Sequence, residues 1–245
     1  MLSKDILIKI AIELDLPDIL EWINVNKRFN KLTNKNDIFW MNKFYHDYEY
    51  YYKPTILTWK EFYKYITLTE PNDLLWKGIE GNVLSYVVVA LKKGADINSK
   101  RNYNFPLSKA SRIGRLEIVK YLVGKGSNSN EKINVGFRRA SENGHLEVVK
   151  YLVGQGANVR VQDDHALTSA SFNGHLEVVK YLVREGANVH ATNDYALRWS
   201  SYNGHLEVVK YLVEHGANVN VNNYESLAWA RINKHLEVVK YLESL

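Results

Sequence analysis

The sequence predicts an all-α protein: a solenoid of stacked helix-turn-helix units that follows a small three-helix module. Three observations lead to this fold class. One short segment recurs at equal intervals through the second half of the chain, beginning at positions 114, 144, 174, 204 and 234, which is typical of repeat proteins. Each copy carries apolar residues at helical spacing. Residues 1–45 lack the repeat but hold three apolar stripes of their own.

Composition limits the class of protein. The chain has 245 residues, of which 46% are hydrophobic and 24% charged, so it can bury a core. It has no cysteine, which excludes disulfides, cysteine-ligated zinc and thiol catalysis. No apolar run approaches the ~20 residues of a membrane span, and the N-terminus lacks a signal-peptide core. We therefore expect a soluble, intracellular protein of the cytoplasm.

The net charge of +5 belongs to the C-terminal part, because residues 1–70 carry equal numbers of acidic and basic side chains. Basic residues gather only in short pairs, at positions 92–93, 100–101 and 138–139. Such a modest surplus favours solubility or an acidic protein surface as partner over nucleic acid.

Residues 1–45 predict the three-helix module. Ile6, Leu7, Ile10 and Leu14 fall on one helical face, and two further segments repeat the pattern around residues 18–23 and 25–32. A domain this small is marginal in isolation. We expect a partner to cover one face of this module and so to stabilise it.

This layout resembles the F-box, the module by which substrate receptors dock onto the Skp adaptor of cullin-RING ubiquitin ligases. The opening Leu-Pro of that family is Leu2-Ser3 here. The alternative is a helical cap that shields the first repeat. The resemblance implies that the adaptor contacts are Leu2, Ile6, Leu7, Ile10, Leu14, Ile19, Leu20, Val25, Phe29 and Trp40.

Residues 46–75 form a tyrosine-rich bridge between the modules. Seven tyrosines lie between residues 44 and 65, whereas disordered linkers are poor in aromatic residues. We expect an ordered helical bridge. A tyrosine-lined platform for nucleic acid is the alternative, but the segment lacks the matching positive charge.

The repeat predicts pairs of helices. GHLEVVKYLV begins at residues 144, 174 and 204, with GRLEIVKYLV at 114, KHLEVVKYLE at 234 and a weaker unit at 81. Leu146, Val149 and Val153, widened by Val148 and Leu152, give one copy the apolar face of a helix. Glycines such as Gly156 are suited to end it. A shorter helix precedes each copy, and only stacking can bury the faces of such pairs.

These units resemble the ankyrin repeat in their Gly-His-x-Glu-Val-Val-Lys and Gly-Ala-Asn motifs, over residues 76–245 and about six units. The interval between units is shorter by three than that of the family form, which predicts short hairpin fingers. The Thr-Pro-Leu-His motif is mostly lost, so the sequence does not predict the hydrogen bonds that this motif makes between repeats. In the last unit Lys234 replaces glycine and Arg231 a small residue, as expected of an end cap.

No catalytic, cofactor or metal site is expected. Histidines at 145, 175, 205 and 235 would lie one helix-packing distance apart, ~10 Å, whereas zinc ligands lie ~2 Å from their metal. We interpret each as a structural residue that opens its own helix. Signatures of phosphate loops, metalloproteases, nucleophile elbows and kinases are missing from the sequence. The chain is expected to be non-enzymatic.

Comparison between repeats separates constant structural positions from variable ones. The residue two positions before the start of each repeated segment varies, and we expect these residues to form a partner-binding stripe on the concave face. Trp199 and Trp229 either fill space between stacked helices, which we favour, or extend this patch. The stripe and its bordering finger residues are Arg112, Glu142, Phe172, Tyr202, Ile232, Tyr103, Asp164, Tyr195 and Tyr224.

The two resemblances together imply a ligase substrate receptor: the F-box docks on the Skp adaptor and the ankyrin stack holds an unknown target protein. The alternative is an interaction scaffold or decoy with no link to ubiquitin. The Asn-, Lys-, Ile- and Tyr-rich chain also resembles the ankyrin families of giant DNA viruses of amoebae, which implies host proteins as partners in the host cytoplasm. We expect a monomer.

Overall fold

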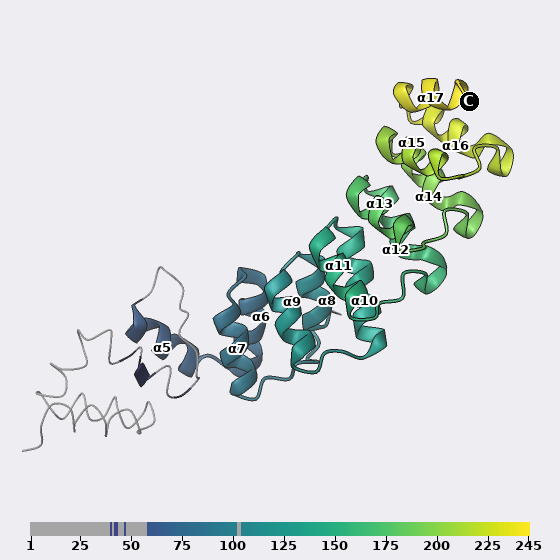
Figure 1. Ribbon diagram of the computed structural model, residues 1–245. Helices are drawn as coiled ribbons and strands as arrows, with labels where there is room; N and C mark the ends of the chain where they lie inside the picture. Colours follow the sequence, from purple (N-terminus) through teal and green to yellow (C-terminus); the bar gives the residue numbers. More distant parts are fainter. Residues whose placement is uncertain (1–39, 41, 44–46, 48–57, 102–103) are drawn as a thin grey trace, which may run out of the picture. The chain divides into compact units, whose positions relative to one another are not determined.

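The chain forms an all-α structure. A computed structural model describes residues 40, 42–43, 47, 58–101 and 104–245. Within those ranges it contains thirteen α-helices and no strand beyond an isolated bridge between Arg101 and Asn104. The chain divides into two compact units, Met1–Ser99 and Lys100–Leu245 (Figure 1). The all-α solenoid is confirmed, whereas the boundaries at residues 45 and 75 stay predictions.

The first unit contains three described helices: α5 (Trp59–Leu68), α6 (Pro71–Gly81) and α7 (Leu84–Lys92). A capping box opens α5, because Thr58 and Glu61 satisfy each other's backbone N–H groups. The α6–α7 pair packs closely at Gly78, where a β-carbon would lie 2.8 Å from Cγ2 of Val87. The described part of the predicted bridge is therefore helical.

Lys93 ties α5 to the end of α7. Its Nζ donates to the carbonyl oxygens of Ile66, Thr67 and Thr69 at 2.8, 2.8 and 2.7 Å. These carbonyls belong to the last turn of α5 and the residue after it, where no helical N–H remains to pair with them. The ring of Phe62 in α5 also stacks on Tyr86 in α7, with centroids 5.8 Å apart.

Trp40 belongs to the core of this unit. Its side chain is fully buried, and its ring lies 5.4 Å from that of Tyr63 in α5. The assignment of Trp40 to the adaptor-docking surface is therefore wrong, because a side chain with no exposed area has nothing to offer a partner. The other predicted docking residues lie outside the described part of the chain: Leu2, Ile6, Leu7, Ile10, Leu14, Ile19, Leu20, Val25 and Phe29.

The second unit stacks five helix pairs in chain order (Figure 1). The first helices of the pairs are α8 (Pro106–Arg112), α10 (Asn130–Glu142), α12 (Val161–Phe172), α14 (Ala191–Tyr202) and α16 (Val221–Ile232). The second helices are α9 (Leu116–Gly124), α11 (Leu146–Gly154), α13 (Leu176–Arg184), α15 (Leu206–Glu214) and α17 (Leu236–Glu243).

Equivalent residues of each pair form the core. In α11 the buried side chains are Val148, Val149 and Leu152, whereas Leu146 and Val153 are half-buried. Val149 is buried as predicted, and Val148 and Leu152, which were expected only to widen the stripe, are buried with it. The first helices contribute small residues, such as Ala170 and Ser171 of α12, which let neighbouring helices approach.

Left-handed turns replace hairpin fingers in the last three units. Gln162, Asp163 and Asp164 all have φ between 53° and 58°, so the regular part of α12 begins at His165. The same conformation recurs at residues 192–194 and 222–224. The shortened repeat leaves little chain between its helices. A turn of three left-handed residues spans that gap, and no strand pairs form among these described residues.

Candidate functional site

The variable row of the repeats lies on the exposed side of the first helices. We define it as Arg112, Glu142, Phe172, Tyr202 and Ile232, which end α8, α10, α12, α14 and α16. Glu142 is half-buried and the other four side chains are exposed. The varying position of each repeat therefore lies at the surface, and its role in partner binding stays a prediction.

Histidines of the next repeat hold the backbone of this row. Nε2 of His145, His175, His205 and His235 lies 2.9–3.1 Å from the carbonyl oxygen of the row residue 33 positions earlier. A carbonyl only accepts, so Nε2 carries the proton. Each histidine also precedes the first residue of its own helix. The prediction of a structural residue that opens its helix is confirmed, and these bonds join the repeats.

Each histidine packs on a glycine that has no room for a side chain. A β-carbon on Gly144 or Gly174 would lie 2.6 Å from the Nδ1 of His175 or His205, and both glycines have positive φ. Lys234 occupies the equivalent position in the last unit. A histidine of a further ankyrin unit could not pack there in the same way.

A second ladder runs through the left-handed turns. The backbone N–H of Asn188 donates to Oδ1 of Asp164, and that of Asn218 to Oδ1 of Asp194, both at 2.9 Å. Asp164 is only 2% exposed. Its predicted place among the partner contacts is therefore wrong: the carboxylate is occupied inside the fold by the next repeat.

Aromatic rings form a continuous cluster over α12, α14 and α16. Trp199 is its centre, with ring centroids 5.2 Å from Phe172, 5.5 Å from Tyr195, 5.3 Å from Tyr202 and 5.3 Å from Trp229. Phe172 and Tyr202 remain 38% exposed.

Both tryptophans are half-buried, so they pack against neighbours and also reach the surface. Trp199 lines a pocket on this face. The favoured interpretation, in which the tryptophans only fill space between helices, is therefore incomplete, because at least Trp199 extends the aromatic patch.

Arg198 packs against the rings of the cluster, and the sequence alone did not predict this role. Its guanidinium lies 4.9 Å from the ring centre of Tyr195 and 5.1 Å from that of Trp229, within cation–π range. Its Nε lies 2.8 Å from the carboxylate of Glu225, and the two side chains are 11% and 24% exposed. Arg198 and Glu225 come from different repeats, so no motif within one repeat indicates the pair.

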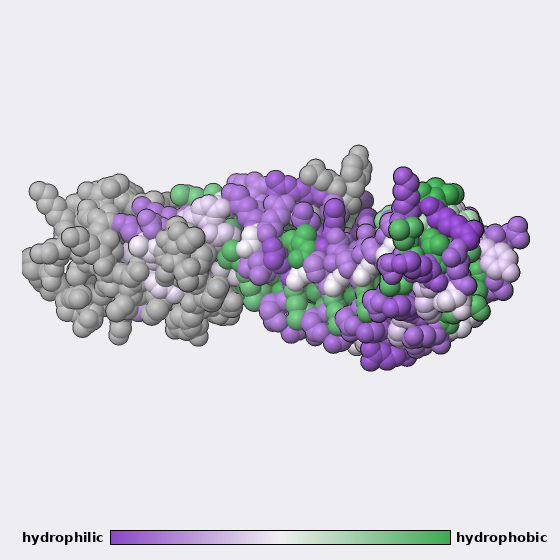
Figure 2. Space-filling view, turned by 90° about the horizontal axis from the view of Figure 1, so that it is seen from above, coloured by the Kyte–Doolittle hydropathy of each residue, from purple (hydrophilic) through white to green (hydrophobic). Residues whose placement is uncertain are grey.

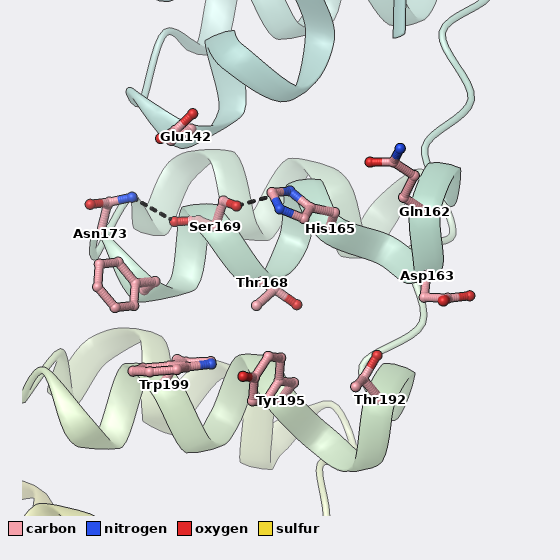
Figure 3. A pocket seen from close by; sticks show the side chains of 11 residues that line it. Glu142, Gln162, Asp163, His165, Thr168, Ser169, Asn173, Thr192, Tyr195 and Trp199 are labelled. Atoms are coloured by element: carbon pink, nitrogen blue, oxygen red, sulfur yellow. Dashed lines mark hydrogen bonds between the residues drawn. The ribbon is translucent and has the colours of Figure 1, made fainter. Parts of the chain in front are cut away.

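A pocket of about 420 Å³ opens over α12 and α14. In Figure 3, Tyr195 and Trp199 project from α14 toward α12, and Thr168 points back toward them. The lining mixes aromatic rings, hydroxyls, amides and two carboxylates, a combination suited to binding a polar or amphipathic group. The residues around it are Glu142, Gln162, Asp163, His165, Thr168, Ser169, Phe172, Asn173, Thr192, Tyr195 and Trp199.

His165 contributes a neutral hydrogen-bonding group to this pocket. Its Nδ1 lies 3.1 Å from Oγ of Ser169, as the dashed line in Figure 3 marks. Burial and then the nearby guanidinium of Arg138 lower the pKa of His165, against the opposing effect of Glu142. The imidazole is therefore uncharged at neutral pH.

Tyr195, Tyr224 and Tyr103 are the three remaining residues predicted to contact a partner. Tyr195 is half-buried in the pocket wall and Tyr224 is 53% exposed on the last left-handed turn. Tyr103 lies outside the described residues.

Among the residues not drawn in grey, Figure 2 shows a mainly hydrophilic face, with hydrophobic residues in small separate patches.

The described residues contain no group of three or more histidine, aspartate or glutamate side chains placed to hold a metal ion. None of their helices is long and apolar enough to cross a bilayer.

The family described as Ankyrin repeats (3 copies) matches residues 77–163, 137–193 and 167–244, which together cover more than half of the chain. A comparison with curated proteins gives no match. Ankyrin repeats support a protein–protein interaction role and are typically non-enzymatic modules. By the extent of this match, the chain belongs to the ankyrin-repeat family.

Proposed function

We propose that this protein is a non-enzymatic substrate receptor of a Skp–cullin–F-box ubiquitin ligase. Residues 1–45 dock on the Skp adaptor, and the concave face of the ankyrin stack binds the target. The aromatic cluster around Trp199 is the observation that carries target binding. In the giant-virus setting that the sequence resembles, the target is a host protein of the cytoplasm.

Target binding is supported by the chemistry of that cluster. Tryptophan and tyrosine are enriched among the residues that dominate binding energies at protein interfaces. Here Phe172 and Tyr202 are exposed beside the half-buried Trp199 and Trp229. The histidine bonds to the carbonyls of Phe172 and Tyr202 hold the backbone of the row, which lowers the cost of ordering it on binding.

Adaptor docking is supported by the residue pattern of the N-terminal module. The match to the F-box rests on apolar residues at helical spacing, among them Ile6, Leu7 and Ile10. The burial of Trp40 against Tyr63 removes one residue from that docking set and leaves the others as proposed contacts.

The receptor would act by proximity. A target held on the ankyrin stack experiences a high effective concentration of the conjugating enzyme that the ligase core brings. The chain has no cysteine to carry ubiquitin as a thioester. Target choice and ubiquitin transfer would therefore belong to different proteins.

A pull-down from eukaryotic lysate tests the ligase half of the proposal. Wild-type protein is expected to retain the Skp adaptor, and Ile6→Asp with Leu7→Asp to lose it. The control, Phe172→Ala with Tyr202→Ala, changes only the ankyrin face and is expected to keep it. No adaptor on the wild type, or its retention by the double aspartate variant, would contradict the proposal.

The second candidate is an interaction scaffold or decoy with no ubiquitin link. Burial of Trp40 favours it, because this large side chain of the N-terminal module packs against Tyr63 inside the chain and is not presented to an adaptor. The same pull-down distinguishes the candidates: a scaffold captures its target and leaves the adaptor in the lysate.

A further inference from the structure

The surface that carries the variable row changes in chemical character along the second unit. Two parallel rows show this: the variable row, and the preceding row three positions earlier on each first helix. In α8 and α10 the rows hold three basic residues and the acidic Glu142, and from α12 to α16 they become aromatic or uncharged. The members of the preceding row are Lys109, Arg139, Ser169, Trp199 and Trp229.

Positive charge at the α8–α10 end is available to a partner. Arg112 is exposed and makes no ion pair among the described residues. Arg139 pairs with Glu142 at 2.9 Å, but their side chains are 48% and 40% exposed. A surface pair of this kind is weak enough for a partner's carboxylate to displace Glu142.

The opposite end is aromatic and holds no basic residue in either row. The carboxylates of Glu142 and Asp163 in its pocket disfavour an acidic group there. The last turns of α12 and α14 contain no basic residue. The guanidinium of Arg198 is already neutralised by Glu225 and covered by aromatic rings. What this end offers is the rims of Phe172 and Tyr202 and the pocket of about 420 Å³ beside Trp199.

We propose that this face binds an extended protein segment that carries acidic residues at one end and a bulky apolar side chain at the other. The acidic end lies over Arg112 and Arg139, and the apolar side chain enters the pocket beside Trp199. The inference rests on the target-binding half of the proposed function and deepens it. It is independent of adaptor docking.

Repeat spacing sets the distance between the two features. Stacked helices lie ~10 Å apart, so α10 and α14 are separated by ~20 Å. An extended chain rises ~3.3 Å per residue, which places the acidic cluster about six residues from the apolar anchor. The proposed recognition element is thus a short linear motif of defined spacing.

Selection from a random library of displayed peptides of about 16 residues tests the proposal, a length that exceeds the required span. On the wild-type full chain we expect enrichment of Asp and Glu about six residues from Trp, Phe or Leu. Arg112→Glu with Arg139→Glu is expected to select Lys and Arg instead. It should also weaken the wild-type peptides about tenfold or more.

Matched controls make the result specific. Lys125→Glu with Arg184→Glu changes the net charge equally at the ends of second helices, and it should leave the selected peptides unchanged. Glutamate is compatible with the fold at position 112, because Glu142 occupies the equivalent site. Phe172→Ala with Tyr202→Ala should remove the apolar half of the motif.

Four outcomes would overturn the inference: no peptide selected, selected peptides without acidic residues, the same peptides on the charge-reversed variant, or nucleic-acid binding in their place. The last is measured with a single-stranded oligonucleotide at low salt, where affinity through Arg112 and Arg139 would fall steeply as salt rises. Adaptor capture is measured separately, so its failure is not confused with any of these.

Discussion

Single residues join the repeats through a glycine–histidine couple. Each histidine donates Nε2–H to a carbonyl of the preceding repeat and presses its ring on a glycine with positive φ. Glycine tolerates this backbone conformation, whereas a β-carbon is disfavoured by ~1–2 kcal/mol and here also meets the ring. The near-identity of the Gly-His pair between units is a packing requirement.

Gly174→Ala is expected to lower the free energy of unfolding by about 2 kcal/mol or more, because it adds both backbone strain and overlap with His205. Gly154→Ala is the control. Gly154 ends α11 with open space around its Cα, so alanine there should be neutral or stabilising by up to ~1 kcal/mol. Urea denaturation measures both, and equal effects would contradict the close packing.

Asp194→Ala should cost about 1–3 kcal/mol, because it leaves the N–H of Asn218 without its acceptor. Asp194→Asn keeps an acceptor oxygen, and Asn134 already serves the N–H of Asn158 in another repeat. We therefore expect the asparagine variant to remain within ~1 kcal/mol of the wild type. Loss of stability as large as that of the alanine variant would argue against the ladder.

His165 should make stability depend on pH. Its pKa in the folded protein is lowered, so the unfolded chain binds more protons as the pH falls through the unfolded value near 6.5. The contribution of neutral His165 to the free energy of unfolding is therefore complete above pH 6.5, and it is lost as the pH falls below that value. Urea denaturation at about pH 7.5 and about pH 5 should show a smaller loss for His165→Gln than for the wild type. An equal loss of stability in the wild type and in His165→Gln would contradict a lowered pKa of His165 in the folded protein.

Among the structural elements, the left-handed turns depart most from what the local sequence predicts. The helices α11, α13, α15 and α17 were predictable, since their apolar spacing repeats in the sequence. The turn at 162–164 was not, because aspartate and glutamine give no local signal for three consecutive positive φ angles. The conformation is held by the hydrogen bond from Asn188 in the next repeat.

Lys93 controls the end of α5. Lys93→Met keeps the aliphatic stem but removes the ammonium that binds three carbonyl oxygens. We expect faster amide hydrogen exchange in the last turn of α5, with little change in α14, because exposed helix ends fray when their carbonyls lose partners. Uniform exchange changes across both helices, or none, would contradict this role.

At the scale of the whole molecule, stability is close to a sum over units and their interfaces, as in other solenoids. Deletion of residues 145–174 joins Gly144 to His175 and so restores the Gly-His junction. Each later histidine again finds a row carbonyl at the same sequence separation as in the intact chain. We expect a folded, cooperative protein with a lower Tm and unchanged helicity per residue in circular dichroism. Loss of helicity would show that the units are not interchangeable.

The fold class and the variable row were predictable because the repeats of one chain can be aligned with each other. Positions that stay constant at equal spacing belong to the structural core, and positions that vary lie at the surface. The roles of Asp164 and Trp40 were not, since burial of a polar or aromatic side chain depends on elements distant in sequence. The Arg198–Glu225 pair was missed for the same reason.

If the aromatic cluster around Trp199 selects the target, removal of its exposed rings should abolish target capture in cells. Quantitative proximity labelling in a eukaryotic host cell compares the wild type with Phe172→Ala plus Tyr202→Ala and with the control Leu236→Ala plus Leu245→Ala. The control removes side chains that are 66% and 62% exposed outside the first helices. We predict that the first variant alone loses the labelled target while its thermal melt stays close to the wild type. Retention of the target by that variant, or its equal loss in the control, would contradict the claim.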